Sequence, residues 1–219
     1  MHRKGLVIAV DGPAASGKGT VASALAREYG LPHLDTGLLY RAVGVLAEAA
    51  GHDLDNADAA AEIAATLDAL AIEDPRFRTR TAGEAASRVA VHPQVRQALL
   101  DLQHRFAEQD GGAVLDGRDI GTVIVPDASA KLFVSAAPEV RAMRRWKQLL
   151  ADNAALSFDD VLADIRLRDA RDAGRAAAPL VIADDAALLD TTDLSISQAA
   201  DAARRIVEAA RARWETSRS

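Results

Sequence analysis

The sequence of 219 residues has no cysteine, no long hydrophobic run and no excess of positive charge. Without cysteine the chain can form neither a disulfide framework nor a thiolate metal site, and it has no cysteine nucleophile. No apolar run approaches the ~18 residues that a membrane-spanning helix requires. A formal net charge of −6 argues against nucleic acid polymers and anionic membranes as general partners. Function is therefore to be sought in a local basic site.

The composition is that of a folded globular chain, with 49% apolar and 26% charged residues. The length suits one domain, or one core with an inserted subdomain. The basic start, residues 1–4, resembles the beginning of a signal peptide, but only five apolar residues follow before Asp11, so we reject that interpretation. We expect a single domain over residues 1–219, acting in the cytoplasm as a monomer.

Short apolar runs alternate with segments of helical periodicity. The apolar run at residues 6–10 predicts a buried strand, residues 33–35 form a possible second one, and further short strands are expected at residues 113–116, 131–134 and 188–190. The periodic segments predict helices at residues 18–29, 38–50, 56–70, 138–150, 157–173 and 195–214. This alternation predicts an α/β fold with three layers around a mainly parallel sheet of about five strands. Two excursions interrupt it, residues 51–110 and 151–178, and we expect both to carry binding residues.

A glycine-rich loop lies between the first predicted strand and the first predicted helix. Its residues are Gly12, Pro13, Ala14, Ala15, Ser16, Gly17, Lys18, Gly19 and Thr20. Glycines let backbone N–H groups turn inward around an anion, the helix N-terminus adds unpaired donors, and Lys18 can reach terminal phosphates. Gly19 occupies the usual Ser/Thr position, so a role for Thr20 in holding Mg²⁺ stays open, and we assign no metal ligand. The alternative is a plain glycine-rich turn.

Polar residues also follow two other predicted strands. They are Asp35, Thr36, Tyr40 and Arg41 after the second, and Asp116, Arg118 and Asp119 after the third. Because ligands of open α/β sheets gather at the carboxyl ends of strands, we expect Lys18, Arg41, Arg118 and Asp119 to converge on one crevice. The alternative is that Asp35 and Asp119 cap helices and that the arginines form surface ion pairs.

The second excursion is dense in arginine and aspartate. Arg168, Asp172 and Arg175 are spaced to share one face if the helix continues that far. A solvated helix of alternating charge would give the same pattern. Beside a phosphate loop, we interpret the segment as a lid whose guanidinium groups meet a transferring phosphoryl group.

Together these features resemble the bacterial cytidylate kinases, which are P-loop nucleoside monophosphate kinases. The matching stretches are residues 11–20, 34–41, 77–79, 87–96, 115–126 and 168–180. The resemblance implies a P-loop kinase core with a monophosphate-binding insert (51–110) and a lid (151–178). It also implies transfer of the γ-phosphoryl group of ATP, with Mg²⁺, to CMP or dCMP.

The resemblance further implies roles for individual residues. Gly12 to Thr20 would hold ATP, and Lys18, Arg118 and Arg175 would stabilise charge during transfer. The residues that would bind CMP are Thr36, Tyr40, Arg41, Arg78, Ser87, Arg96, Arg118, Asp119, Arg168 and Asp172. The chemistry agrees, because Ser87 and Asp119 can accept from the cytosine amine and Arg96 can donate to the ring nitrogen.

The sequence departs from the family at two points, and two other functions stay open. Thr81 stands where the family commonly has Glu, and the stretch from Leu70 to Arg78 is short. One rival is another small-molecule P-loop kinase, acting on UMP or a metabolite. The other is a nucleotide-dependent switch, although the sequence lacks the guanine-reading Asn/Thr-Lys-x-Asp motif.

Overall fold

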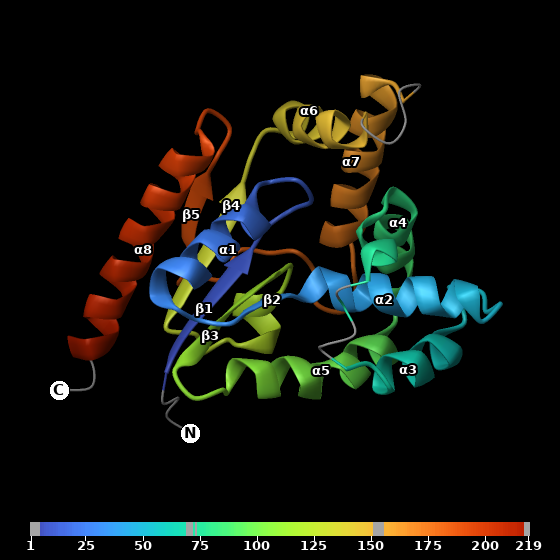
Figure 1. Ribbon diagram of the computed structural model, residues 1–219, viewed down its shortest axis with the longest axis horizontal. Helices are drawn as coiled ribbons and strands as arrows, with labels where there is room; N and C mark the ends of the chain where they lie inside the picture. The colour runs from blue at the N-terminus through green and yellow to red at the C-terminus, as the bar shows by residue number, and fades with distance from the viewer. Residues whose placement is uncertain (1–4, 69–71, 73, 151–155, 217–219) are drawn as a thin grey trace.

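Short apolar strands pair into one parallel sheet at the centre of the molecule (Figure 1). The computed structural model describes residues 5–68, 72, 74–150 and 156–216. Within these residues the strands are β1 (Leu6–Asp11), β2 (His33–Asp35), β3 (Gly112–Gly117), β4 (Ala130–Ser135) and β5 (Ala187–Asp190). Their order is β2-β3-β1-β4-β5, and every pairing is parallel. The predicted strands and the parallel sheet are confirmed.

Helices cover both faces of the sheet. Ile8 and Val10 point to the face covered by α1 (Lys18–Tyr29) and α8 (Ile196–Thr216). The residues that alternate with them on β1, such as Val7 and Ala9, pack against the helices of the other face, α2 (Thr36–Ala49) and α5 (Pro93–Ala107). Burial on both faces explains why β1 is a continuous apolar run, and it confirms the three-layer architecture. No helix in the described part of the chain is long and apolar enough to cross a membrane.

The first excursion, residues 51–110, adds α3 (Ala57–Ala65), η2 (Pro75–Arg78), α4 (Arg80–Val89) and α5. Asn56 caps α3 as predicted, since its side chain accepts a hydrogen bond from Ala59 N at 3.2 Å. The helix ends at Ala65 rather than near Leu70, which lies outside the described residues; the Thr66 hydroxyl instead bonds locally to Ile63 O. α4 packs closely on α2. The glycine at Gly44 permits this approach, since an added Cβ there would lie 2.6 Å from the Cβ of Ala85.

α6 (Pro138–Leu149) precedes the second excursion, residues 151–178, which carries α7 (Phe158–Ala173). Ser157 caps α7 by accepting from Asp160 N at 3.1 Å, as predicted. The helix ends at Ala173, where the N–H of Gly174 bonds to Ala170 O, so the prediction that Arg175 shares a helical face with Asp172 is wrong. Residues 151–155 of the expected lid, like residues 1–4, lie outside the described residues. The limits of the insert and the lid stay predictions.

Candidate active site

The glycine-rich loop leaves β1 and turns back onto the N-terminus of α1. Gly12 has φ 153°, and a Cβ there would lie 2.1 Å from Val134 O, so only glycine fits. Gly17, with φ 90°, is the N-cap residue of α1. Because it has no side chain, it makes no side-chain capping hydrogen bond. Without such a cap, the first N–H groups of α1 can donate to a ligand, and the helix dipole favours an anion.

Side chains from α6 and from the segment after β5 hold the loop from behind. Thr191 Oγ1 donates to Ser16 O at 2.8 Å, and Arg144 Nη2 donates to Thr191 O at 2.6 Å. The buried Arg141 donates to Ala14 O at 3.3 Å and makes a two-pronged ion pair with Asp169 of α7 at 2.9 and 2.6 Å. The loop is thus shaped before any ligand binds, and α7 is linked to it through Arg141.

Two carboxylates, the buried Asp116 and the partly buried Asp35, stand beside the loop at the ends of neighbouring strands. Asp35 of β2 lies opposite Asp116 of β3 in the sheet register. Burial raises the pKa of Asp35, and the nearby Asp116 raises it further. Lys18 Nζ lies 3.7 Å from Asp116 Oδ1, and burial lowers the pKa of Lys18. The sequence places both aspartates at strand ends, but only the register of β2 on β3 shows that they lie side by side, so neither was predicted as a site residue.

Asp116 also has unused hydrogen-bonding capacity. Its carboxylate is 1% exposed, and Oδ1 has no hydrogen-bond partner among the described residues. A spare carboxylate oxygen next to a phosphate loop fits a hard cation such as Mg²⁺, which prefers oxygen ligands. Within the described chain no group of three or more His, Cys, Asp or Glu side chains is placed to hold a metal ion by itself. A metal here would need the nucleotide phosphates as ligands.

Asp11, the last residue of β1, fixes the turn that follows β3. Its two carboxylate oxygens accept from Ile120 N and Gly121 N, each at 2.7 Å. These bonds hold the segment that begins with Arg118 and Asp119. Burial outweighs them and raises the pKa of Asp11 to about 6.

This raised pKa predicts a specific dependence of stability on pH. The folded state binds the Asp11 proton more tightly than the unfolded state, so the stabilisation is complete below about pH 4 and is lost as the pH rises through about 6. The shift corresponds to roughly 3 kcal/mol at most. Between pH 4 and 7 the unfolding free energy of the parent should therefore fall relative to that of Asp11→Asn, as measured by urea denaturation. The exposed Asp101→Asn should track the parent, and a parallel curve for Asp11→Asn would refute the assignment.

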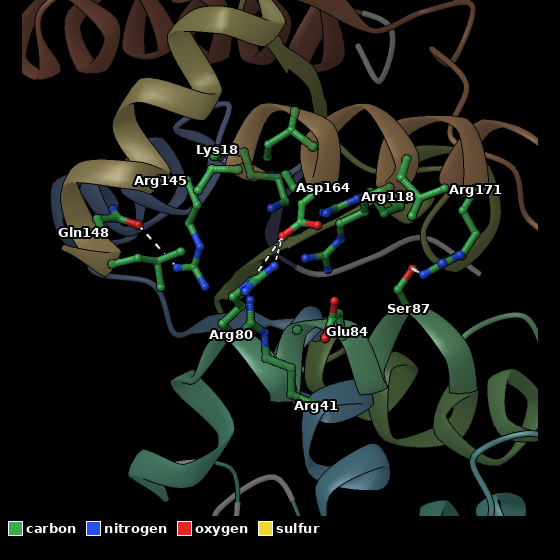
Figure 2. Close-up of a pocket in the computed structure, with 18 residues that line it drawn as sticks. Lys18, Arg41, Arg80, Glu84, Ser87, Arg118, Arg145, Gln148, Asp164 and Arg171 are labelled. Carbon is green, nitrogen blue, oxygen red and sulfur yellow. Dashed lines mark hydrogen bonds and ion pairs between the residues drawn. The ribbon is translucent and has the colours of Figure 1, made fainter. Parts of the chain in front are cut away.

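A positively charged crevice opens between α4 and α7 (Figure 2). Lys18, Arg41 and Arg118 line it together, as predicted, and Arg168 joins them, whereas Asp119, which was expected with them, lines the adjoining cavity instead. The Nε of Arg168 has no hydrogen-bond partner in the described chain. Burial and the neighbouring Arg118 lower the pKa of Arg168 to about 9, which leaves it protonated at neutral pH. The crevice therefore holds cationic charge that an anionic ligand would neutralise.

Part of that charge is already paired by Asp172. Its buried carboxylate accepts from Arg118 Nε at 2.8 Å and also pairs with Arg175. Arg175 therefore reaches the site although it lies beyond the end of α7. Asp172 thus stands between one arginine of the expected lid, Arg175, and Arg118 from the segment after β3.

A second cavity adjoins the crevice, since Ser87, Arg118 and Arg168 line both. Arg96 pairs with Asp119 on its wall, and the Arg96 guanidinium lies 5.5 Å from the centre of the Tyr40 ring. Neither Asp35 nor Asp119 caps a helix with its side chain, so the capping alternative is not observed. The lining of this cavity thus includes the Ser87 hydroxyl, the Asp119 carboxylate and the Arg96 guanidinium.

The remaining predicted site residues lie around these cavities. Thr36 Oγ1 donates to Asp116 O at 2.9 Å, and Arg41 Nη1 donates to Thr79 O at 3.1 Å. Arg78 and Thr20 are exposed and line an outer cavity that includes Lys18. Residues 14–20 of the loop line at least one of the three cavities. Gly12 and Pro13 line none of the three.

Two polar contacts that the sequence analysis missed join α4 directly to α7 (Figure 2). Arg80 Nε donates to Asp164 Oδ2 at 3.1 Å, and Arg171 Nη1 donates to Ser87 Oγ at 3.0 Å. The partners are seven residues apart on each helix, so the two helices run side by side in the same direction. Nothing in the sequence indicates which helices pair, so this signal could not be read in advance.

A parallel sheet whose central strand runs into a glycine-rich loop, beside an arginine-lined crevice, defines a P-loop kinase. The family described as cytidylate kinase matches residues 8–209. A cytidylate kinase of Caulobacter sp. (strain K31) is 65% identical over 208 residues, covering 95% of this chain and 96% of that protein. One of Xanthobacter autotrophicus is 63% identical over 207 residues, covering 94% and 99%. The chain belongs to the cytidylate kinase family.

The fold has wider relatives among solved structures. A gluconokinase from Sinorhizobium meliloti superimposes with a TM-score of 0.52 at 14% identity, covering 99% of both chains. An uncharacterized protein from Eubacterium ventriosum gives 0.51 at 14% identity, covering 93% of this chain and 98% of that one. At such identity the likeness concerns the fold alone.

Proposed function

We propose that the crevice between the loop, α4 and α7 is where this kinase transfers the γ-phosphoryl group of ATP to CMP or dCMP. The products are ADP and CDP or dCDP. The observation that carries the placement is the pair of adjoining cavities, one lined by Lys18 and the other by Arg96 and Asp119, joined through Arg118 and Arg168. The cavity for phosphate transfer and the cavity for base recognition thus share Arg118 and Arg168 in their walls.

ATP occupies the loop side. Its phosphates bind the N–H groups at the start of α1 and the Lys18 ammonium, while its nucleoside extends into the outer cavity. That cavity is bordered by Thr191, Leu194, Ser195 and Ile196, a mixture of apolar and polar groups that suits a base and a ribose.

CMP occupies the α4 side. Its base enters the corner formed by Ser87, Arg96 and Asp119, where acceptor and donor match the amine and ring nitrogen of cytosine. Uracil presents a carbonyl and an N–H at those two positions, so the same groups would oppose it. Arg168 and Asp172 lie near the sugar, and Arg41, Arg78 and Arg118 receive the monophosphate.

The reaction needs no nucleophile from the protein. An oxygen of the CMP phosphate attacks the γ-phosphorus as the bond to the bridging oxygen of ADP breaks, and the transferred group passes directly between them. Lys18, Arg118 and Arg175 stabilise charge on the transferring group. These interactions strengthen when closure excludes water, because a charge pair at 4 Å gains ~1 kcal/mol in water but ~4 kcal/mol at an effective dielectric constant near 20.

Mg²⁺, bound with ATP, supplies charge neutralisation at the phosphates. Asp116 is the residue of this chain that best suits it, through the unpartnered Oδ1, and Asp35 contributes further negative charge nearby. Thr20 stays a second candidate from the loop. We further propose that the protein acts as a cytoplasmic monomer, without nucleic acid or membrane partners.

A kinase and a nucleotide switch differ in their need for an acceptor. We expect ADP release from ATP–Mg²⁺ to depend on added CMP, because the crevice must be filled to place an attacking oxygen beside the γ-phosphorus. A coupled assay with and without CMP measures this. Equal ADP release in both conditions would reject the proposed transfer.

The lid makes a separate prediction. ATP and CMP together bring the negative charge that Arg168 and Arg175 can meet, so they should favour the closed form and slow amide exchange across residues 158–178. Arg175→Ala should weaken this protection and lower kcat about tenfold, the effect of losing ~1.4 kcal/mol of transition-state stabilisation, with little change in ATP affinity. The control is Arg166→Ala on the same helix. It removes an exposed arginine that pairs with Glu139 of α6, and it should behave like the parent. Identical exchange in the free and doubly liganded protein would leave α7 as a merely solvated helix.

A further inference from the structure

His33 lies at the edge of the site, yet nothing in the proposed reaction uses it. It is the first residue of β2, and its Nε2 lies 2.7 Å from Asp116 Oδ2. In the register of the sheet His33 pairs with Val114 and Asp35 pairs with Asp116, so the four residues share one face. The imidazole is about a quarter exposed, whereas the carboxylate it contacts is almost fully buried.

The contact engages one oxygen of Asp116 and fixes the plane of its carboxylate. An ionised carboxylate can only accept, so the Nε2–H of His33 is the donor to Oδ2. Oδ1 is left without a hydrogen-bond partner in the described chain and lies 3.7 Å from Lys18 Nζ. Both carboxylate oxygens lie near Gly19, since a Cβ added there would be 3.9 Å from Oδ1 and 4.0 Å from Oδ2. Without His33, the carboxylate could rotate about its last bond and lose the orientation that leaves Oδ1 available beside Lys18 Nζ.

The backbone around Asp116 is fixed independently of His33. Thr36 Oγ1 donates to the carbonyl oxygen of Asp116, and the strand is paired on both sides. His33 therefore acts on the orientation of the carboxylate rather than on the position of the strand. Groups that orient a metal-binding carboxylate typically change metal affinity by 10- to 100-fold when they are removed.

We propose that His33 is a positioning residue that holds Asp116 Oδ1 toward the divalent cation of the ATP complex. The inference rests on the proposed function, which gives Asp116 that role. His33 does not touch the substrate or the reacting atoms; it acts through Asp116. If its role were only to join β2 to β3, replacing it would change stability and leave metal affinity unaltered.

The test measures Mn²⁺ binding to the protein–ATP complex by electron paramagnetic resonance, in the absence of CMP. His33→Leu should weaken Mn²⁺ binding about tenfold. His33→Gln should restore most of it, because the glutamine amide can place an N–H donor where Nε2 lies. The double variant His33→Leu/Asp116→Asn should bind Mn²⁺ no more weakly than Asp116→Asn alone. The exposed His52→Leu should match the parent, and thermal unfolding should accompany each titration.

The outcomes separate the inference from the function beneath it. If Asp116→Asn binds Mn²⁺ like the parent, the proposed metal role of Asp116 fails and this inference fails with it. If Asp116→Asn weakens binding while His33→Leu does not, His33 is not a positioning residue and the metal role stands. If His33→Leu weakens binding equally in the Asp116→Asn background, His33 does not act through Asp116. If His33→Leu fails to fold, near-parental Mn²⁺ binding by a donor-free His33→Phe variant would overturn the inference, and weakened binding would support it.

Discussion

Replacing Lys18 with methionine should lower turnover of ATP and CMP by about 10² or more, the effect of losing one preorganised charge at a transferring group. Methionine keeps the apolar stem and removes the ammonium. Lys18 is the lysine that lines both the crevice and the outer cavity, so its charge lies where the two nucleotides meet. Initial rates of ADP release at saturating substrates measure the change directly.

The structure alters one expectation for this variant. The sequence alone suggests an exposed lysine that contributes little to folding, but the side chain is only 15% exposed and lies beside the buried Asp116. Removing it leaves two neighbouring carboxylates with less compensating charge, so some loss of stability is expected and must be measured. The exposed Lys147→Met is the matched control and should keep full activity. Near-parental turnover in folded Lys18→Met would refute the phosphate-loop assignment.

Replacing Arg96 with methionine should reduce kcat/KM for CMP by about 10² or more and erase most of the preference over UMP. The variant loses the donor to the ring nitrogen of cytosine and leaves Asp119 without its ion-pair partner in a buried corner. A site built around hydrogen bonds discriminates strongly, because a mismatched base leaves buried polar groups unpaired. ATP affinity should change little, since Arg96 does not line the outer cavity.

Arg105 offers a control on the same helix. It is an exposed arginine of α5, and Arg105→Met removes the same charge without touching either cavity. Steady-state kinetics with CMP and UMP on both variants give the comparison. An unchanged CMP-to-UMP ratio in Arg96→Met would show that this corner does not read the base.

The sheet could be predicted because its strands are buried on both faces. Residues 6–10 and 132–134 are unbroken apolar runs, and nearly all of their side chains are buried in the central strands β1 and β4. Two helices of the first excursion carried signals that were not used. In α4 the buried Ala82, Ala86 and Val89 recur at helical spacing. α5 has Pro93 at its start and Val95, Leu99 and Leu102 at helical spacing.

Site residues that are contiguous in the sequence could be predicted, whereas those brought together by strand pairing or helix packing could not. The phosphate loop is contiguous, so its residues and their order were sufficient to predict it. Asp116 became a site residue only through the register of β2 on β3, and Arg171 only through the packing of α7 on α4. Arg175 was predicted on the wrong geometry, as part of a helix that ends before it, yet it reaches the site through Asp172.

The most direct measurement is ADP release with ATP–Mg²⁺ across five acceptors: CMP, dCMP, UMP, AMP and GMP. Ser87, Arg96 and Asp119 line a cavity that opens onto the crevice of Lys18, so the base that matches this corner should decide the rate. We predict that CMP and dCMP give kcat/KM values at least about 10²-fold above that of UMP, and that the purine monophosphates lie lower still. UMP equal to CMP, or a purine monophosphate as the best acceptor, would contradict the account.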